Sequence, residues 1–326
     1  MTNLFSIVLF VATLAGIEGA FAQPFPSRPI TIIVPFAAGG STDVTARIVG
    51  EHMSRTLGQR ILIENIAGAG GTTGSIRAMR ANPDGYTIEM GNMGTHAAAV
   101  ALYQNLAYRP DTDFAPIGVV HSAPVMIVAR KDFPAENLNE FVSYLRASAH
   151  KLNMAHAGVG SAVFSCGLLF NSVVGVMPTL VPFNGAAPAM NALVGGQVDY
   201  MCDGGIINSM AHEQSSRIKA YVIDAEQRSP LLPNVPTARE AGLPEFKVSA
   251  WAAFFAPRET PKAVLDKLAE ALDLALDDLQ TRKQLLELGA EVPDTADRGQ
   301  QPLAALVRRD RARWTAIISA AKVKAE

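Results

Sequence analysis

The stretch that decides the fold is PITIIVPFAAGGSTD, residues 29–43. Its first half is a β-branched run, Ile30–Val34, which predicts a short buried strand. Two glycines then end the strand, and Ser41 or Thr42 can cap a following helix. This order of elements brings free backbone N–H groups and the positive end of a helix dipole to one point. The stretch therefore predicts a site that holds an anion without a lysine or arginine.

Two further glycine turns repeat the arrangement. Residues 68–74, GAGGTTG, follow a predicted strand at Ile61–Glu64, and residues 158–161, GVGS, follow one at Leu152–His156. Each turn leads into a predicted helix, the second of these near Val163–Val174. Three turns that can each bind an anion suggest capture of a small carboxylate.

Strands and helices alternate along the rest of the chain, which predicts α/β units with parallel sheets covered on both faces. Further strands are predicted at Tyr86–Met90, Ile117–Val120, Leu180–Phe183, Val198–Cys202 and Ile218–Ile223. Further helices are predicted near Thr42–Leu57 and Leu138–Ala147 and in the C-terminal region. One of these C-terminal helices is expected to begin with Thr260 as its cap and Pro261 at its first position. Its core-facing stripe is formed by Leu265, Leu268, Leu272, Leu276 and Leu279.

The 326 residues exceed what one core usually organises, so we expect two domains. A new series of strands and helices starts after Val125–Ala129, and the C-terminal helices are expected to cover the first sheet. The first domain is then discontinuous, formed by residues 23–124 and 249–326, and residues 125–248 form the second. The strands Val125–Ala129 and Val248–Ala256 cross between the domains.

Residues 1–22 resemble an export signal, with an apolar run followed by Ala20-Phe21-Ala22, which a signal peptidase reads before Gln23. No Lys or Arg precedes the run, and the alternative is a membrane anchor, although the run is shorter than the ~20 residues that a span needs. No cysteine lies near the cleavage site to carry a lipid, so we expect a freely diffusing periplasmic protein. Cys166 and Cys202 either form a disulfide there or are buried thiols.

Charge and motifs exclude several classes of function. The chain has 28 basic and 30 acidic residues without a basic cluster, which argues against nucleic acid and anionic membranes as partners. Residues 68–74 resemble a dinucleotide-binding turn, but residues 86–92 supply no acidic residue at the end of the next strand. No P-loop and no histidine pair at metal-ligand spacing occurs, so we expect neither cofactor nor metal.

Ser161 and Cys166 are formal candidates for a nucleophile, with His156 and His96 as bases. No nucleophile elbow surrounds them, and helix capping explains Ser161. Asp203 ends a predicted strand, where it either meets a ligand at the sheet edge or caps the next segment. The sequence leaves the positions of four aromatic residues undecided. Phe36, Phe164 and Phe183 either line the cleft or lie in the core, and Trp251 either lines the cleft or packs between the domains.

The chain resembles the extracytoplasmic receptors of tripartite tricarboxylate transporters, often called the Bug family. The resemblance covers essentially all of the chain after residue 22. The segments that carry it are residues 29–43, Gly68–Thr72, Asn82–Thr87, Asp113–Ile117, Gly185–Ala189, Gly195–Asp199, Leu232–Thr237, Trp251 and Phe255–Pro257.

The resemblance implies a periplasmic-binding-protein clamshell of the Venus flytrap, type II class, with a small organic acid in the cleft between the domains. The family's carboxylate grip, partly through ordered water, is carried over to the loop after the first strand and to the third glycine turn. The ligand-binding residues so implied are Phe36, Ala37, Ala38, Gly39, Gly40, Ser41, Thr42, Asp43, Gly70, Gly71, Thr95, Gly160, Ser161, Ala162, Phe164 and Asp203.

Two departures from the family pattern bear on the ligand. Family members commonly carry Ser-Pro-Ser-His where this chain has Ser161-Ala162-Val163-Phe164, and a polar Asn where it has Gly204. Both changes make the second-domain wall less polar. We therefore hypothesise a ligand with one carboxylate at the glycine turns and a less polar remainder, aromatic or aliphatic, rather than citrate.

The sequence thus predicts a monomeric periplasmic solute-binding protein, without catalytic chemistry, that delivers a carboxylate to the membrane subunits of a tripartite transporter. Hinge closure around the ligand would be the signal that the transporter reads. Two alternatives stay open. One is a receptor that reports ligand to a signalling partner, and the other is an exported enzyme on the same fold.

Overall fold

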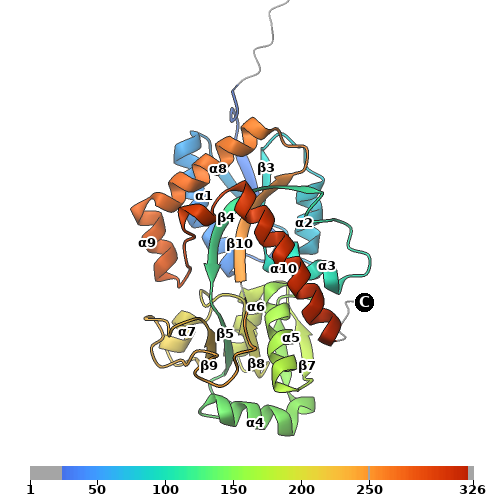
Figure 1. Cartoon of the computed structure of the whole chain (residues 1–326). Helices are drawn as coiled ribbons and strands as arrows, with labels where there is room; N and C mark the ends of the chain where they lie inside the picture. Colours follow the sequence, from blue (N-terminus) through green and yellow to red (C-terminus); the bar gives the residue numbers. More distant parts are fainter. Residues whose placement is uncertain (1–23, 249, 322–326) are drawn as a thin grey trace, which may run out of the picture.

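The computed structural model describes residues 24–248 and 250–321, which form two α/β domains, one above the other in Figure 1. The expected export signal, residues 1–22, lies outside the described residues. Each domain is built on a five-stranded sheet. The strand orders are β2-β1-β3-β10-β4 and β7-β6-β8-β5-β9.

The first sheet contains β1 (Ile30–Val34), β2 (Ile61–Asn65), β3 (Thr87–Asn92), β4 (Phe114–Ala123) and β10 (Ala250–Pro257). Its helices are α1 (Ser41–Leu57), α2 (Thr72–Met79), α3 (Ala99–Leu102), α8 (Lys262–Asp277), α9 (Leu279–Glu287) and α10 (Gln300–Ala321). A π-helical turn, Gly94–Ala98, links β3 to α3. Short 3-10 turns lie at Ala69–Gly71 and Thr295–Asp297.

The second sheet contains β5 (Val125–Arg130), β6 (Asn153–His156), β7 (Thr179–Pro182), β8 (Tyr200–Asp203) and β9 (Ile218–Asp224). Its helices are α4 (Leu138–Ser148), α5 (Ala162–Val174), α6 (Ala186–Val194) and α7 (Met210–Gln214), with a 3-10 turn at Ala149–Lys151. The sequence did not predict α6, whose first turn lies within Gly185–Ala189, one of the segments that carry the family resemblance.

Both sheets are mixed, which corrects the expectation of parallel sheets. In the first sheet β10 runs antiparallel to β3 and β4, and in the second β5 runs antiparallel to β8 and β9. Both strands follow a passage of the chain from the other domain. Such a strand has no crossover helix to return it to the starting edge, so it enters its sheet in the opposite direction.

Side chains that alternate along the strands build a core on each face of the first sheet. Ile32 packs into a cluster with α1 and α8, whereas Ile33 packs into one with α2 and α10. Both β5 and β10 are buried along almost their whole length. Figure 1 shows α10 running from the first domain toward the second, where it contacts α5.

The passages between the domains are short. Pro124 alone separates β4 from β5. On the return, the Val248 N–H donates to the Asp224 carboxylate at the end of β9, whereas Ala250 already pairs with Ala123 of the first sheet. We propose that the domain boundaries lie where the sequence predicts them, with residues 125–248 as the second domain.

Two expectations about the C-terminal helices were wrong. Leu279 is 83% exposed, because α8 ends at Asp277 and the Asp278 carboxylate caps a new helix by accepting from the Thr281 N–H at 2.8 Å. Thr260 makes no side-chain cap, and Pro261 occupies the N-cap position rather than the first helical one. The other four leucines of the stripe are buried as predicted.

The two cysteines form a disulfide, which settles an alternative that the sequence left open. Cys166 of α5 is joined to Cys202 of β8, and both residues are fully buried. The bridge ties α5, whose first turn meets the other domain, to the centre of its own sheet.

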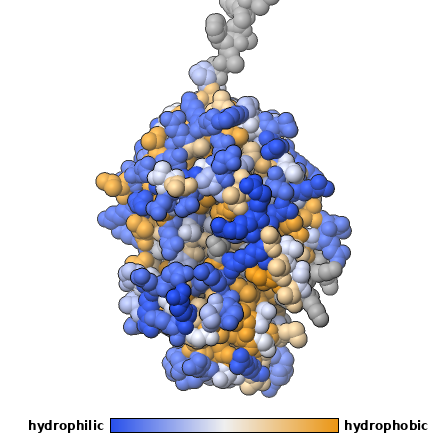
Figure 2. Space-filling view, in the orientation of Figure 1, coloured by the Kyte–Doolittle hydropathy of each residue, from blue (hydrophilic) through white to orange (hydrophobic). Residues whose placement is uncertain are grey.

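No helix within residues 24–248 and 250–321 is both long and apolar enough to cross a membrane. Figure 2 shows hydrophilic side chains over most of the first domain in this view, and apolar side chains gathered on the second domain.

Glu89 is a fully buried carboxyl group on β3. Its Oε1 accepts from the Ser75 hydroxyl at 2.6 Å, and its Oε2 lies 4.0 Å from Nε2 of His96 without a hydrogen-bond partner. Burial outweighs the Ser75 hydrogen bond and raises the pKa of Glu89 to about 8, while burial lowers the pKa of His96 to about 3. Both groups are therefore neutral at neutral pH.

The raised pKa predicts how Glu89→Gln changes stability. Glu89 takes up a proton on folding, so the stability it contributes is present below its ordinary pKa of 4.5 and is lost as the pH rises through about 8. The free energy of unfolding of the glutamine variant, relative to that of the wild type, should rise by about 1.4 kcal/mol per pH unit between about pH 5 and pH 8. It should rise no further above that range. Urea unfolding across this range measures the gain, and Glu64→Gln, at an exposed position of the same sheet, is the control. A difference in unfolding free energy between Glu89→Gln and the wild type that stays constant across this pH range would contradict the conclusion that Glu89 is buried and neutral.

Candidate functional site

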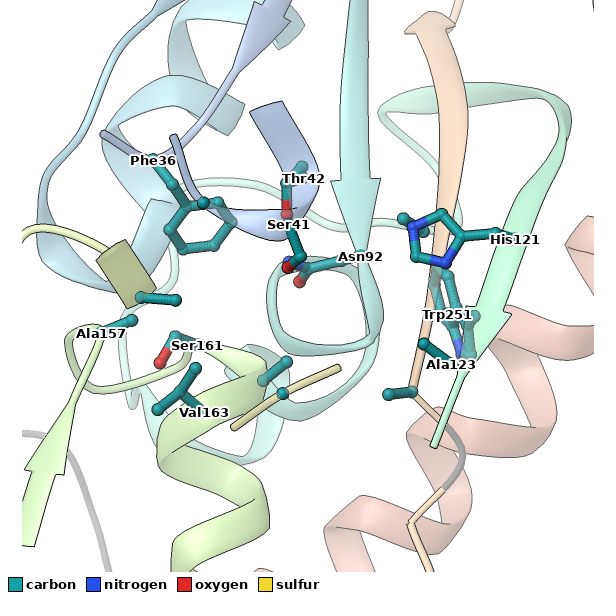
Figure 3. A pocket seen from close by; sticks show the side chains of 16 residues that line it. Phe36, Ser41, Thr42, Asn92, His121, Ala123, Ala157, Ser161, Val163 and Trp251 are labelled. Carbon is teal, nitrogen blue, oxygen red and sulfur yellow. The ribbon is translucent and has the colours of Figure 1, made fainter. Parts of the chain in front are cut away.

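A small cavity lies between the two domains, where the ends of strands and helices from both meet (Figure 3). The volume of this cavity is about 40 Å³. The first domain lines it with Phe36, Gly40, Ser41, Thr42, Asn92, His121, Ala123, Ala250, Trp251 and Ala252. The second domain lines it with Ala157, Ser161, Ala162, Val163, Ala186 and Gly204.

Helix α1 presents an uncapped N-terminus to the cavity. Its N-cap is Gly40, which has no side chain to satisfy the first N–H groups, and the first bond back to Gly40 comes from Val44. The N–H groups of Ser41, Thr42 and Asp43 therefore precede the intrahelical bonds. Ser41 and Thr42 add hydroxyl groups at the cavity wall.

Two helices of the second domain also begin at the cavity. Ser161 caps α5, its hydroxyl accepting from the Phe164 N–H at 3.1 Å, which leaves the N–H groups of Ala162 and Val163 at the wall. Helix α6 begins at Ala186 after Gly185, which provides no side-chain cap. Three helix N-termini thus meet at one cavity.

The lining supplies no formal charge that could neutralise an anion. None of the described residues around the cavity is Lys, Arg, Asp or Glu. Partial positive charge comes instead from the three helix dipoles and their unpaired N–H groups. Within the described chain no group of three His, Cys, Asp or Glu side chains is placed to hold a metal ion. The arrangement suits a small anion with an apolar body.

Asp43 holds the loop that carries the α1 N-terminus. Its carboxylate accepts from the Gly39 N–H at 2.9 Å, from Asn65 Nδ2 at 3.0 Å and from the Arg47 side chain. Burial alone would raise the pKa of Asp43, but the hydrogen bonds from Arg47, Gly39 and Asn65 lower it below its ordinary value. Asp43 is 3% exposed and is not among the residues that line the cavity, so it positions the loop instead of lining the site.

Asn92, Ala252 and His121 form a row across the first sheet. Ala252 pairs with Asn92 of β3 on one side and with His121 of β4 on the other. Residues paired directly across strands share a face, and all three line the cavity. The Ala252 methyl group therefore has one polar side chain on each side, Asn92 on one and His121 on the other.

Glycines allow the two domains to touch backbone to backbone beside the cavity. A Cβ on Gly70 would overlap the Val159 carbonyl of the second domain, and one on Gly94 would overlap the Ala162 N–H. The Tyr103 hydroxyl lies 3.0 Å from the Ala69 oxygen and 2.7 Å from the Val159 oxygen, so it can donate to either domain. A further contact between the domains is made by the Ala37 N–H, which donates to the Asn184 oxygen at 3.1 Å.

The structure gathers part of the predicted site around the cavity. Six predicted residues line it: Phe36, Gly40, Ser41, Thr42, Ser161 and Ala162. Six more lie outside the lining in the loops that flank it, and several of these meet the other domain: Ala37, Ala38, Gly39, Gly70, Gly71 and Gly160. The remaining four, Asp43, Thr95, Phe164 and Asp203, are buried side chains outside the lining.

Local bonds explain why these side chains turn away. Thr95 exchanges hydrogen bonds with Asn92, its N–H donating to Oδ1 and its Oγ1 accepting from the N–H, each at 3.1 Å. Phe164 is 1% exposed and packs edge-on against His156. The expected aromatic wall at Phe164 is therefore absent from the described lining, and Val163 and three alanines supply the apolar surface instead.

Asp203 caps the segment after β8, the second of the two roles left open. Its carboxylate accepts from the Ser209 hydroxyl at 2.7 Å, the Ser209 N–H at 3.0 Å and Asn208 Nδ2 at 3.0 Å. Burial raises the pKa of Asp203 to about 6 despite these bonds. Its neighbour Gly204 lines the cavity in its place.

Sequence reasoning missed the first-domain wall formed by Asn92 and His121, and the α6 N-terminus at Ala186. Both residues lie just beyond the predicted ends of their strands, Asn92 two residues after Met90 and His121 one residue after Val120. A polar residue directly after a predicted strand is a usable signal. Trp251, whose role the sequence left open, lines the cavity. It is 3% exposed, and its indole N–H donates to Asp310 of α10 in the same domain at 2.7 Å.

Comparison with known proteins gives one consistent family. The sequence model described as the tripartite tricarboxylate transporter family receptor matches residues 45–323. A protein of the UPF0065 group from Agrobacterium vitis is 39% identical over 91% of this chain and 85% of its own length.

Two solved structures share the fold closely. MatC from Rhodopseudomonas palustris, with bound malate, is 50% identical, with a TM-score of 0.88 over 90% of this chain and all of that one. The periplasmic binding protein BugD is 40% identical, with a TM-score of 0.88 over 93% of this chain and all of its own. The two-domain clamshell predicted from the sequence is confirmed.

The contacts of Asp43 predict that Asp43→Asn destabilises the protein at neutral pH by on the order of 2 kcal/mol, because a buried, charge-assisted network is weakened. The pKa of Asp43 is lowered by folding, so its contribution is present above pH 3.8 and is lost as the pH falls through the lowered value. Urea unfolding at neutral and acidic pH should show the gap between wild type and variant narrowing in acid. Asp266→Asn, in an exposed pair with Lys262, should change little. Equal effects of the two substitutions would contradict the role of Asp43.

Proposed function

We propose, from the premise that the chain belongs to the tripartite tricarboxylate transporter receptor family, that it captures a small carboxylate between its two domains and delivers it to the membrane subunits of such a transporter. The proposal includes export to the periplasm with cleavage near Ala22. No catalytic step is part of it.

The observation that carries the proposal is the meeting of three helix N-termini at a cavity whose described lining has no charged side chain. A carboxylate placed there accepts hydrogen bonds from N–H groups of both domains at once. Each donor belongs to the first turn of a helix, where the dipole favours negative charge. The same donors offer little to a cation or to an apolar molecule.

The size and walls of the cavity favour a short aliphatic acid. Its second-domain side is formed by Ala157, Ala162, Val163 and Ala186, which suits methylene groups. The bound malate of the Rhodopseudomonas relative is an acid of this size. Phe164, one of the two reasons for expecting a less polar ligand, lies in the core, so the hypothesis of an apolar remainder now rests on Gly204 and these small side chains.

Closure would couple binding to delivery. The donors lie on both domains, so a ligand that binds α1 and α5 together favours the closed arrangement over an open one. The hydroxyl of Ser161, once considered as a nucleophile, is the α5 cap, which supports a binding role over a catalytic one.

Thermal unfolding with added ligands tests the function. Ligand should be stripped first by unfolding and refolding the protein. A short-chain carboxylate at ~100 times its dissociation constant should add about 2.7 kcal/mol of stability, which raises the midpoint by a few degrees. Mono-, di- and tricarboxylates, aromatic acids and amino acids form the panel, and the primary amides of the best acids are the matched neutral controls. A rise with the amides equal to that with the acids would contradict anion capture.

The domain contact at Gly70 predicts that Gly70→Ala blocks closure. Its added Cβ would overlap the Val159 carbonyl of the other domain, so affinity for the acid that best stabilises the wild type should fall at least tenfold in titration calorimetry. Small-angle scattering with that acid should show no compaction. Gly58→Ala has a similar positive φ, 65° against 63°, with open space around its Cβ, and is the matched control for backbone strain. Equal affinities of the two variants would contradict the closed arrangement.

A further inference from the structure

The geometry points to His121, with Asn92, as the pair that selects the ligand: they bind a second polar group, a hydroxyl or a second carboxylate, held over Ala252. This inference rests on the proposed function, in which the helix N-termini hold the first carboxylate. It replaces the expectation of a wholly apolar remainder: the ligand has a second polar end at the first-domain wall, and only its methylene body lies against the apolar second-domain wall.

The first observation is that His121 is buried without any hydrogen-bond partner. The residue is 5% exposed, and neither Nδ1 nor Nε2 has a partner among the described residues. A buried polar group without a partner costs on the order of 1–3 kcal/mol, so most such groups in folded proteins are paired. His121 lines the cavity and its ring points toward it in Figure 3, so a ligand atom can supply the missing bond.

The second observation is that the backbone is distorted just before His121. Ala252 pairs with His121, but the next residue, Ala253, pairs with Val119, which leaves Val120 as an extra residue in β4. A bulge of this kind redirects the neighbouring side chain and is common next to binding sites. In this protein the bulge interrupts the regular pairing of β4 with β10 beside His121, whose imidazole enters the cavity.

The third observation is the small residue between the two polar ones. Neighbouring strands are about 4.8 Å apart, so Asn92 and His121 stand roughly 10 Å apart across Ala252 at the backbone. Long side chains on both sides of a methyl group leave a recess that one carboxylate or hydroxyl can enter. A larger residue at position 252 would fill it.

The orientation of Asn92 fits the same role. Its Oδ1 accepts from the Thr95 N–H at 3.1 Å, so its Nδ2 group is the end left to donate. Burial lowers the pKa of His121 to about 4 and outweighs the opposing effect of the nearby Ser122 backbone, which makes no well-formed hydrogen bond with the ring. The ring is therefore neutral and presents one N–H donor and one acceptor nitrogen. Two donors facing a recess match a carboxylate, and the acceptor nitrogen adds a partner for a hydroxyl group.

The buried histidine of the neighbouring core behaves differently. His96 has the Thr95 hydroxyl 3.0 Å from its Nδ1, and its ring stacks on Phe255. Its Nε2 lacks a hydrogen-bond partner but lies 4.0 Å from Oε2 of Glu89, and the residue does not line the cavity. A packing role explains His96, but it leaves both nitrogens of His121 unaccounted for.

Calorimetric titration of the wild type, His121→Phe and His121→Gln tests the inference. Each dicarboxylate is paired with the monocarboxylate of the same length, succinate with butyrate and adipate with hexanoate, and malate adds a hydroxyl. The wild type should prefer the diacids. The phenylalanine variant should lose about ten- to hundredfold in affinity for them, as expected for a hydrogen bond to a charged group, and should keep or gain affinity for the monoacids. The glutamine variant, which retains a donor and an acceptor, should keep most of the preference.

His212→Phe, on α7 and outside the cavity lining, is the matched control and should bind as the wild type does. Ala252→Val provides a second test if His121→Phe folds poorly: it should weaken diacids and spare monoacids. Unchanged diacid affinity in His121→Phe, or an equal loss for diacids and monoacids, would overturn the assignment of His121. Failure of the wild type to bind any acid would instead overturn the proposed function, and the inference with it.

Discussion

Three helices direct their N-terminal N–H groups at one cavity, and no described side chain around it carries a formal charge. The partial positive charges repel one another when the domains close, and an anion between them turns that repulsion into attraction. Because α1 belongs to one domain and α5 and α6 to the other, the anion is also what joins the two halves. Binding and closure are then one event.

Much of the rest of the structure serves this placement. The Asp43 network fixes the α1 loop from behind, the Cys166–Cys202 disulfide ties α5 to its sheet, and Asp203 caps the segment that brings Gly204 to the cavity. The glycines at 70 and 94 let the domains approach backbone to backbone. The helix ends are thus held by bonds outside the cavity, which leaves their own N–H groups for a ligand.

Local pattern predicted the strands, the glycine turns and the Ser161 cap of α5, because each depends on neighbours in sequence. It expected Ser41 or Thr42 to cap α1, where Gly40 is the N-cap, and it missed α6. It could not predict that β10 and β5 run antiparallel, since that follows from how the chain passes between domains. The family resemblance placed Phe164 at the site, but helical rotation turns that ring into the core. His121 was out of reach for a similar reason: the bulge at Val120 that directs it arises from pairing with β10, more than 100 positions later in the chain.

The measurement that tests the central claim most directly is a crystal structure of the protein with its best-binding acid. The account predicts a carboxylate within about 3 Å, directly or through one ordered water, of N–H groups at the starts of both α1 and α5. A carboxylate held by an arginine or lysine, or bound to one domain without contact to the other, would contradict it.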